Sequence, residues 1–134
     1  MEKPGNTLNI LLWIAQVILA AIFLMAGFMK SFTPMDELAD SLPWVTNTPV
    51  ALVRFIGISE LLGALGMILP SALRILPKLT VVAAVGLCIV MVLAAGFHIL
   101  RSEWQALPIN FALFALSAFV AWGRSKKVVI QAKK

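Results

Sequence analysis

The sequence predicts an all-α membrane protein, a four-helix bundle with a short interfacial helix in its first outer loop. Apolar residues make up 61% of the 134 residues and charged residues 13%, about half the charged share of a soluble domain. Four apolar stretches are each about as long as the roughly 20 helical residues that cross a bilayer. We predict one domain, residues 1–134, with spans at about 8–30, 49–69, 78–99 and 105–123 and a basic tail at 124–134.

The segments between the spans have turn signals of their own. In the loop 31–48, Thr33 and Pro34 resemble the start of a helix, and Met35, Leu38 and Leu42 would share one face of it. We expect a short helix on the outer surface that covers whatever lies beneath it. Two prolines give boundaries: Pro70 is predicted to end the second span, and Pro108 predicts a kink or a restart in the fourth.

The charge distribution predicts the orientation. The net charge is +5, but most Lys and Arg residues flank the spans rather than forming a patch typical of nucleic-acid binding. Eight of the basic residues fall on the side of the two termini: Lys3, Arg74, Lys78, Arg124, Lys126, Lys127, Lys133 and Lys134. We therefore expect both termini in the cytoplasm, a tail that meets anionic lipid head groups, and no nucleic-acid partner.

The counts of cysteine and histidine exclude several kinds of site. Cys88 is the only cysteine and His98 the only histidine, so the chain has no intrachain disulfide, CxxC pair or cysteine-based metal site, and we predict no metal. No electron carrier is visible in the sequence, so no cofactor is intrinsic. Whether the chain catalyses a reaction by itself stays open.

The polar residues of the spans gather at one depth. With cytoplasmic termini, the outer half of the bilayer would hold Lys30, Arg54, Glu60, His98, Arg101 and Asn110, contributed by all four spans. Glu60 lies about 16 Å along the helix from Pro49, too deep to reach water, so its carboxyl group must be paired or protonated. Arg54, Lys30 and His98 are alternative partners.

Two interpretations of this layer compete. In the first, it is a buried ion pair with Asn110 that fixes helix packing. In the second, it is a pocket where Glu60 and His98 act as catalytic proton carriers and Lys30, Arg54, Arg101 and Asn110 bind a ligand, a quinone head group being our candidate cofactor. Imidazole, carboxylate and amide groups supply the hydrogen bonds and the proton exchange that a quinone requires.

The second span, with the segment Arg-Phe-Ile-Gly-Ile-Ser-Glu-Leu-Leu-Gly-Ala at 54–64, resembles that of the DoxX-like family. Lys30 closing the first span, His98 closing the third and Asn110 opening the fourth fit the same resemblance. It implies a four-helix protein of the bacterial inner membrane, and some members of the family are linked to redox complexes and quinol chemistry. Relatives that use paired cysteines are no guide, because this chain has only Cys88.

We therefore predict a quinone-associated redox accessory subunit whose partners are the lipid bilayer and a membrane redox protein or further copies of the chain. Two other functions remain as alternatives. One is a non-enzymatic assembly factor or chaperone that uses small-residue helix faces, and the other is a carrier for a small solute.

Overall fold

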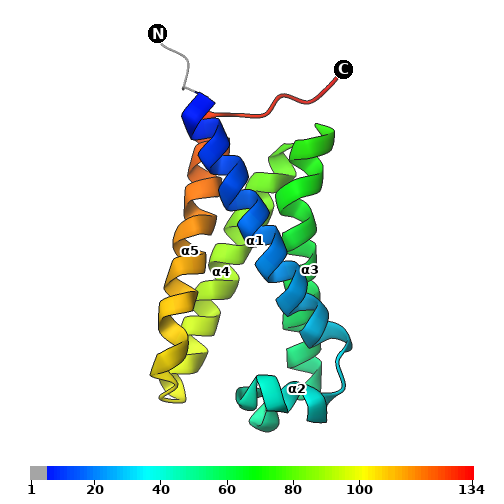
Figure 1. The fold of residues 1–134 in the computed structure, drawn as a ribbon, viewed down its shortest axis with the longest axis vertical. Coiled ribbons are helices and arrows are strands. Elements are labelled where there is room, and N and C mark those ends of the chain that lie inside the picture. Colours follow the sequence, from blue (N-terminus) through cyan, green and yellow to red (C-terminus); the bar gives the residue numbers. More distant parts are fainter. Residues whose placement is uncertain (1–5) are drawn as a thin grey trace.

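The computed structural model describes residues 6–134; Lys3, which contributes to the predicted charge asymmetry, lies outside them. Figure 1 shows four long helices: α1 (Asn6–Phe32), α3 (Val50–Leu73), α4 (Lys78–Leu100) and α5 (Leu107–Trp122). Each is long and apolar enough to cross a membrane, when α5 is counted with its flanking turns. The structure confirms the predicted all-α class, with a short helix between the first and second spans.

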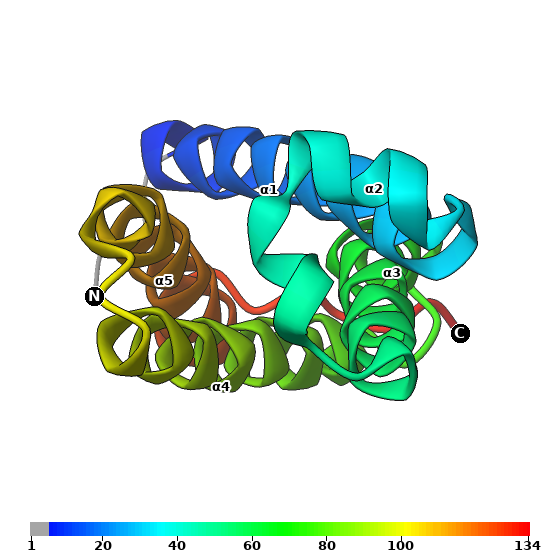
Figure 2. The ribbon, with the colours of Figure 1, turned by 90° about the horizontal axis from the view of Figure 1, so that it is seen from below.

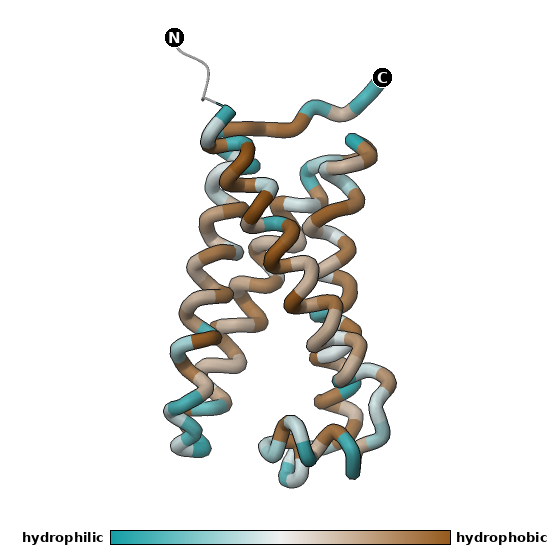
Figure 3. The backbone as a smooth tube through the Cα atoms, viewed as in Figure 1, coloured by the Kyte–Doolittle hydropathy of each residue, from teal (hydrophilic) through white to brown (hydrophobic). Residues whose placement is uncertain are grey.

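The outer surfaces of these helices are apolar. Large side chains that are more than 60% exposed include Phe55, Leu62, Val82 and Leu93. Figure 3 shows hydrophobic residues along the helices and hydrophilic residues gathered toward their two ends. Exposed apolar surface of this extent is stable in lipid and not in water, so the chain is a multi-pass membrane protein.

The helices pack as two pairs, α1 with α3 and α4 with α5, joined through α3 and α4. The first pair approaches most closely at glycine: a Cβ atom added at Gly57 would lie 2.7 Å from the backbone nitrogen of Ser31. In Figure 1 the two pairs diverge toward the end opposite the termini, where α2 lies. The site described below is at this diverging end.

Two short helices connect α1 to α3: α2 (Met35–Ser41) and the 3₁₀ helix η1 (Pro43–Asn47). Leu38 and Val45 are buried against Val53 of α3, and Met35 and Leu42 pack on the same cluster, as the predicted face requires. The helix start predicted at Thr33 and Pro34 lies one residue later for its cap: Pro34 is the N-cap of α2, and no side chain caps the helix. Seen from below, the segment after α2 extends between α1 and α4 (Figure 2).

The prediction that Pro70 ends the second span is wrong, because α3 continues through Pro70 to Leu73. Proline has no N–H group, so the carbonyl of Gly66, four residues earlier, loses its helical partner. The hydroxyl of Thr80 on α4 donates to that carbonyl at 2.9 Å and lies 2.7 Å from the hydroxyl of Ser71. A neighbouring helix thus supplies the missing hydrogen bond, which allows the proline to stay inside a membrane helix.

The fourth span restarts at Pro108, as one of the two predicted alternatives has it. A 3₁₀ turn, η2 (Trp104–Ala106), comes first, and Pro108 then lies in the first turn of α5. After Trp122 the chain continues in a π-helical turn, η3 (Gly123–Lys127). Arg124, predicted as the first residue of a lipid-facing tail, is instead only 3% exposed and is buried inside this turn. Two of its hydrogen-bond partners, Gln16 and Asn9, lie far away in the sequence, on α1.

Candidate functional site

An ion pair between α1 and α3 is the centre of the site. Lys30 is in the last turn of α1, and its Nζ lies 2.7 Å from Oε1 of Glu60 on α3. The Glu60 side chain is 2% exposed and that of Lys30 is 14% exposed. Of the three partners considered for Glu60, the structure selects Lys30. The second carboxylate oxygen, Oε2, is buried without a hydrogen-bond partner among the described residues.

Arg54, predicted as a ligand-binding residue, contacts the backbone of α1 instead. Its Nη1 donates to the carbonyl of Lys30 at 3.0 Å and to that of Thr33 at 2.7 Å. Carbonyl groups at the end of a helix lack partners within that helix, and a cationic side chain satisfies them well. Arg54 therefore anchors the end of α1, and with it the backbone of Lys30.

His98 hydrogen-bonds to Glu103, and Glu60 has no part in this contact. Its Nδ1 lies 2.9 Å from Oε1 of Glu103, and Nε of Arg101 lies 3.2 Å from the same oxygen. A carboxylate only accepts hydrogen bonds, so Nδ1 of His98 carries the proton and Nε2 of a neutral ring is left as an acceptor. Glu103 was not singled out from the sequence, although an acid two residues beyond Arg101 was a usable signal.

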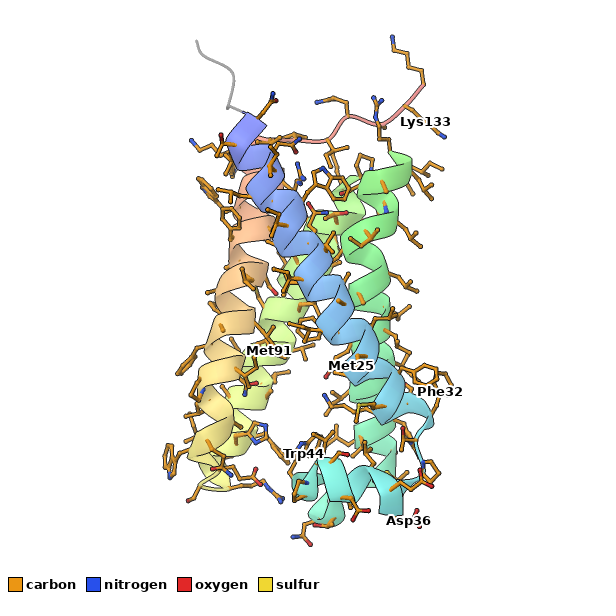
Figure 4. The ribbon with its side chains drawn as sticks, viewed as in Figure 1. Met25, Phe32, Asp36, Trp44, Met91 and Lys133 are labelled. Atoms are coloured by element: carbon orange, nitrogen blue, oxygen red, sulfur yellow. The ribbon has the colours of Figure 1, made fainter. Side chains whose placement is uncertain are left out.

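Trp44 on η1 joins the two helix pairs across the diverging end. The Trp44 ring packs edge-on against Phe97 and His98 of α4, with ring centroids 5.5 and 6.1 Å apart. Nζ of Lys30 lies 6.0 Å from the centroid of the Trp44 ring. Its carbonyl accepts a hydrogen bond from Arg101 at 3.4 Å. Figure 4 shows Trp44 below the space between the two helix pairs. Trp44 is thus the residue of this loop that is placed to cover the space between the two helix pairs.

A cavity of about 440 Å³ lies inside this end of the bundle. Four of the six predicted site residues line it, one from each long helix: Lys30, Glu60, His98 and Asn110. The same four residues line an adjoining cavity of about 270 Å³, which has Phe55 and Leu93 on its lipid-facing side. The other two, Arg54 and Arg101, line neither and hold backbone carbonyls.

Two residues of the cavity wall each carry a buried polar atom without a partner, one a hydrogen-bond donor and the other an acceptor. Nδ2 of Asn110 is buried with no partner among the described residues, as is Oε2 of Glu60. Such atoms are rare in folded proteins, because an unpartnered buried polar group costs about 1–3 kcal/mol. Each of these atoms calls for an explanation, and a ligand in the cavity that reaches them is one.

Glu103 gives this end of the molecule a pH dependence. The hydrogen bond from the His98 ring has the largest effect and lowers the pKa of Glu103 below its ordinary value of 4.5; burial opposes it, and the charge of Arg101 adds to the lowering. A lowered pKa means stabilisation that is present above pH 4.5 and lost as pH falls through the folded-state pKa. Thermal unfolding should thus show a stability loss on acidification that Glu103→Gln reduces. An equally steep loss in that variant would contradict this role.

The sequence comparisons identify the family. No curated protein and no solved structure matches the chain. The model of the DoxX-like family matches residues 14–120, a range that takes in most of α1, all of α3 and α4, and nearly all of α5. All four residues that line both cavities, Lys30, Glu60, His98 and Asn110, fall inside it. The chain is therefore a member of the DoxX-like family.

Proposed function

We propose that this protein binds a quinone in the cavity between its two helix pairs and acts as an accessory subunit of a membrane redox system. The observation that carries the proposal is the convergence of a cation, a carboxylate, an imidazole and an amide, one from each membrane helix, on one cavity. Its volume of about 440 Å³ falls within the range typical of small-molecule sites, roughly 300–1,000 Å³.

The donors and acceptors of the four lining residues match the head group of a quinone. Quinone carbonyls accept hydrogen bonds, and Nζ of Lys30 and Nδ2 of Asn110 are donors. The hydroxyls of the reduced form donate, and Oε2 of Glu60 and Nε2 of His98 are acceptors. The adjoining cavity, with Phe55 and Leu93 beside it, gives the isoprenoid tail an apolar route toward lipid.

The two acceptors can take up the two protons that a quinol releases. Oxidation of a quinol releases two protons and two electrons; on this proposal Glu60 and His98 each take one proton and the electrons pass to a redox partner. Each acceptor already contacts a charged neighbour, Lys30 for Glu60 and Glu103 for His98. Glu103 lies in the loop before α5, so a proton on His98 has a carboxylate beside it on the way to water.

Binding of a short-chain quinone to the protein in lipid nanodiscs tests the proposal, with quenching of tryptophan fluorescence as the signal. Asn110→Leu leaves the ion pair in place and removes the free donor, and Glu60→Gln removes the charged acceptor. Each should weaken binding roughly 5- to 150-fold, the loss that corresponds to one unpaired polar group. Glu37→Gln, on the exposed surface of α2, is the matched control. Wild-type protein that binds no quinone, or both variants binding normally, would refute it.

A further inference from the structure

At the opposite end of the bundle, Arg124 is buried, and no counter-ion for it lies among residues 6–134. Its Nε donates to Oε1 of Gln16 at 2.6 Å, and its Nη1 donates to Oδ1 of Asn9 at 2.8 Å and to the carbonyl of Val128 at 3.2 Å. All of these acceptors are neutral. The third nitrogen, Nη2, is buried and has no hydrogen-bond partner in the part of the chain that the structure describes.

Neutral acceptors do not balance the charge of a guanidinium group. A buried cation is normally paired with an anion, because its removal from water costs several kcal/mol. The π face of Trp13, 5.3 Å from the guanidinium carbon, supplies only part of that compensation. Among residues 6–134 no carboxylate forms a salt bridge with Arg124. Within residues 6–134 the charge of Arg124 therefore stays uncompensated, and an anion bound in the adjoining cavity would balance it.

A cavity of about 290 Å³ adjoins Arg124, and its lining combines polar and apolar residues, as a site for an amphiphile requires. Its polar lining includes a second cation, Lys78, and two hydroxyl groups, those of Ser71 and Ser125. Its apolar lining includes Val81 and Val82, which follow Lys78 on the same face of α4, and Val82 is 62% exposed toward lipid. The cavity lies where α4 begins and where α5 has ended, which is the depth of the lipid head groups.

We propose that this cavity binds the phosphodiester head group of an anionic phospholipid, with Arg124 and Lys78 as its cationic partners and an acyl chain along Val81 and Val82. Arginine and lysine are the two cationic side chains best suited to phosphate oxygens. The bound phosphate neutralises the buried charge. Because Arg124 contacts Gln16 and Asn9 of α1, the lipid also holds the end of α5 against α1.

Native mass spectrometry of the detergent-purified protein, titrated with three ligands, tests this site. The ligands are phosphatidylglycerol, which is anionic, phosphatidylcholine, which is zwitterionic, and inorganic phosphate, which lacks acyl chains. We expect one phosphatidylglycerol to be retained in preference to phosphatidylcholine. Equal retention of the two lipids would overturn the role of charge, and inorganic phosphate binding as tightly as phosphatidylglycerol would overturn the assignment to a lipid.

Two variants locate the binding to this cavity. Lys78 is exposed, so Lys78→Gln should fold normally and weaken phosphatidylglycerol binding about fivefold, the effect of one basic residue at a membrane surface. Arg124→Gln should weaken it further. Lys126→Gln, which removes an exposed charge from the same turn but outside the cavity, is the matched control. If Lys78→Gln and Lys126→Gln reduce binding equally, the interaction is diffuse and the proposed site is wrong.

Discussion

Lys30→Met is expected to destabilise the protein by about 3–5 kcal/mol, the largest effect of any single substitution considered. The change removes the only ion-pair partner that Glu60 has among residues 6–134. Oε2 of that carboxylate is already unpartnered, so the substitution leaves a buried carboxyl group that has no partner on either oxygen and must take up a proton. Unfolding in SDS, followed by circular dichroism, measures the loss.

A second substitution distinguishes the ion pair from a general effect of residue 30. Lys30→Met combined with Glu60→Gln removes both charges, and replacing a whole buried pair with neutral groups is often tolerated. The double variant should therefore be more stable than Lys30→Met alone. It should still fail to bind a quinone, since it lacks both the cationic donor and the charged acceptor. A double variant no more stable than the single one would show that Lys30 acts through something other than Glu60.

Gly57→Ala is expected to cost about 1–3 kcal/mol, as overpacking of a tight interface does. The added Cβ atom would lie 2.7 Å from the backbone nitrogen of Ser31 and 2.7 Å from Cβ of Lys30. Backbone atoms cannot rotate away, so α1 and α3 must separate. Because Lys30 is one of the two residues displaced, quinone binding should fall along with stability.

The control for this variant comes from α4. A Cβ atom added at Gly86 meets nothing within 4 Å, so Gly86→Ala tests the substitution without the crowding. Alanine also favours a helix over glycine, and we expect Gly86→Ala to be as stable as the wild type or slightly more so. Both variants are compared by the same SDS unfolding measurement. Equal destabilisation of the two would show that the α1–α3 contact is not specially tight.

The hydropathy of the chain was enough to predict the four helices, because a stretch of apolar residues long enough to cross lipid is a local property of the sequence. The face of α2 that carries Leu38 followed from local spacing in the same way. The prediction at Pro70 failed for the opposite reason. Whether proline ends a membrane helix depends on a donor for the freed carbonyl, and Thr80 belongs to another helix.

In the candidate site, too, some features follow from the local sequence and others depend on contacts between helices. The sequence determined that Lys30, Glu60, His98 and Asn110 lie at one depth, since depth follows from the distance along each helix. Only the tertiary structure decided that Lys30 and not Arg54 pairs with Glu60, that His98 turns to Glu103, and that Arg124 is buried. These outcomes depend on how far each helix is rotated about its axis and where the helices cross, which are set by side-chain packing between segments distant in the chain.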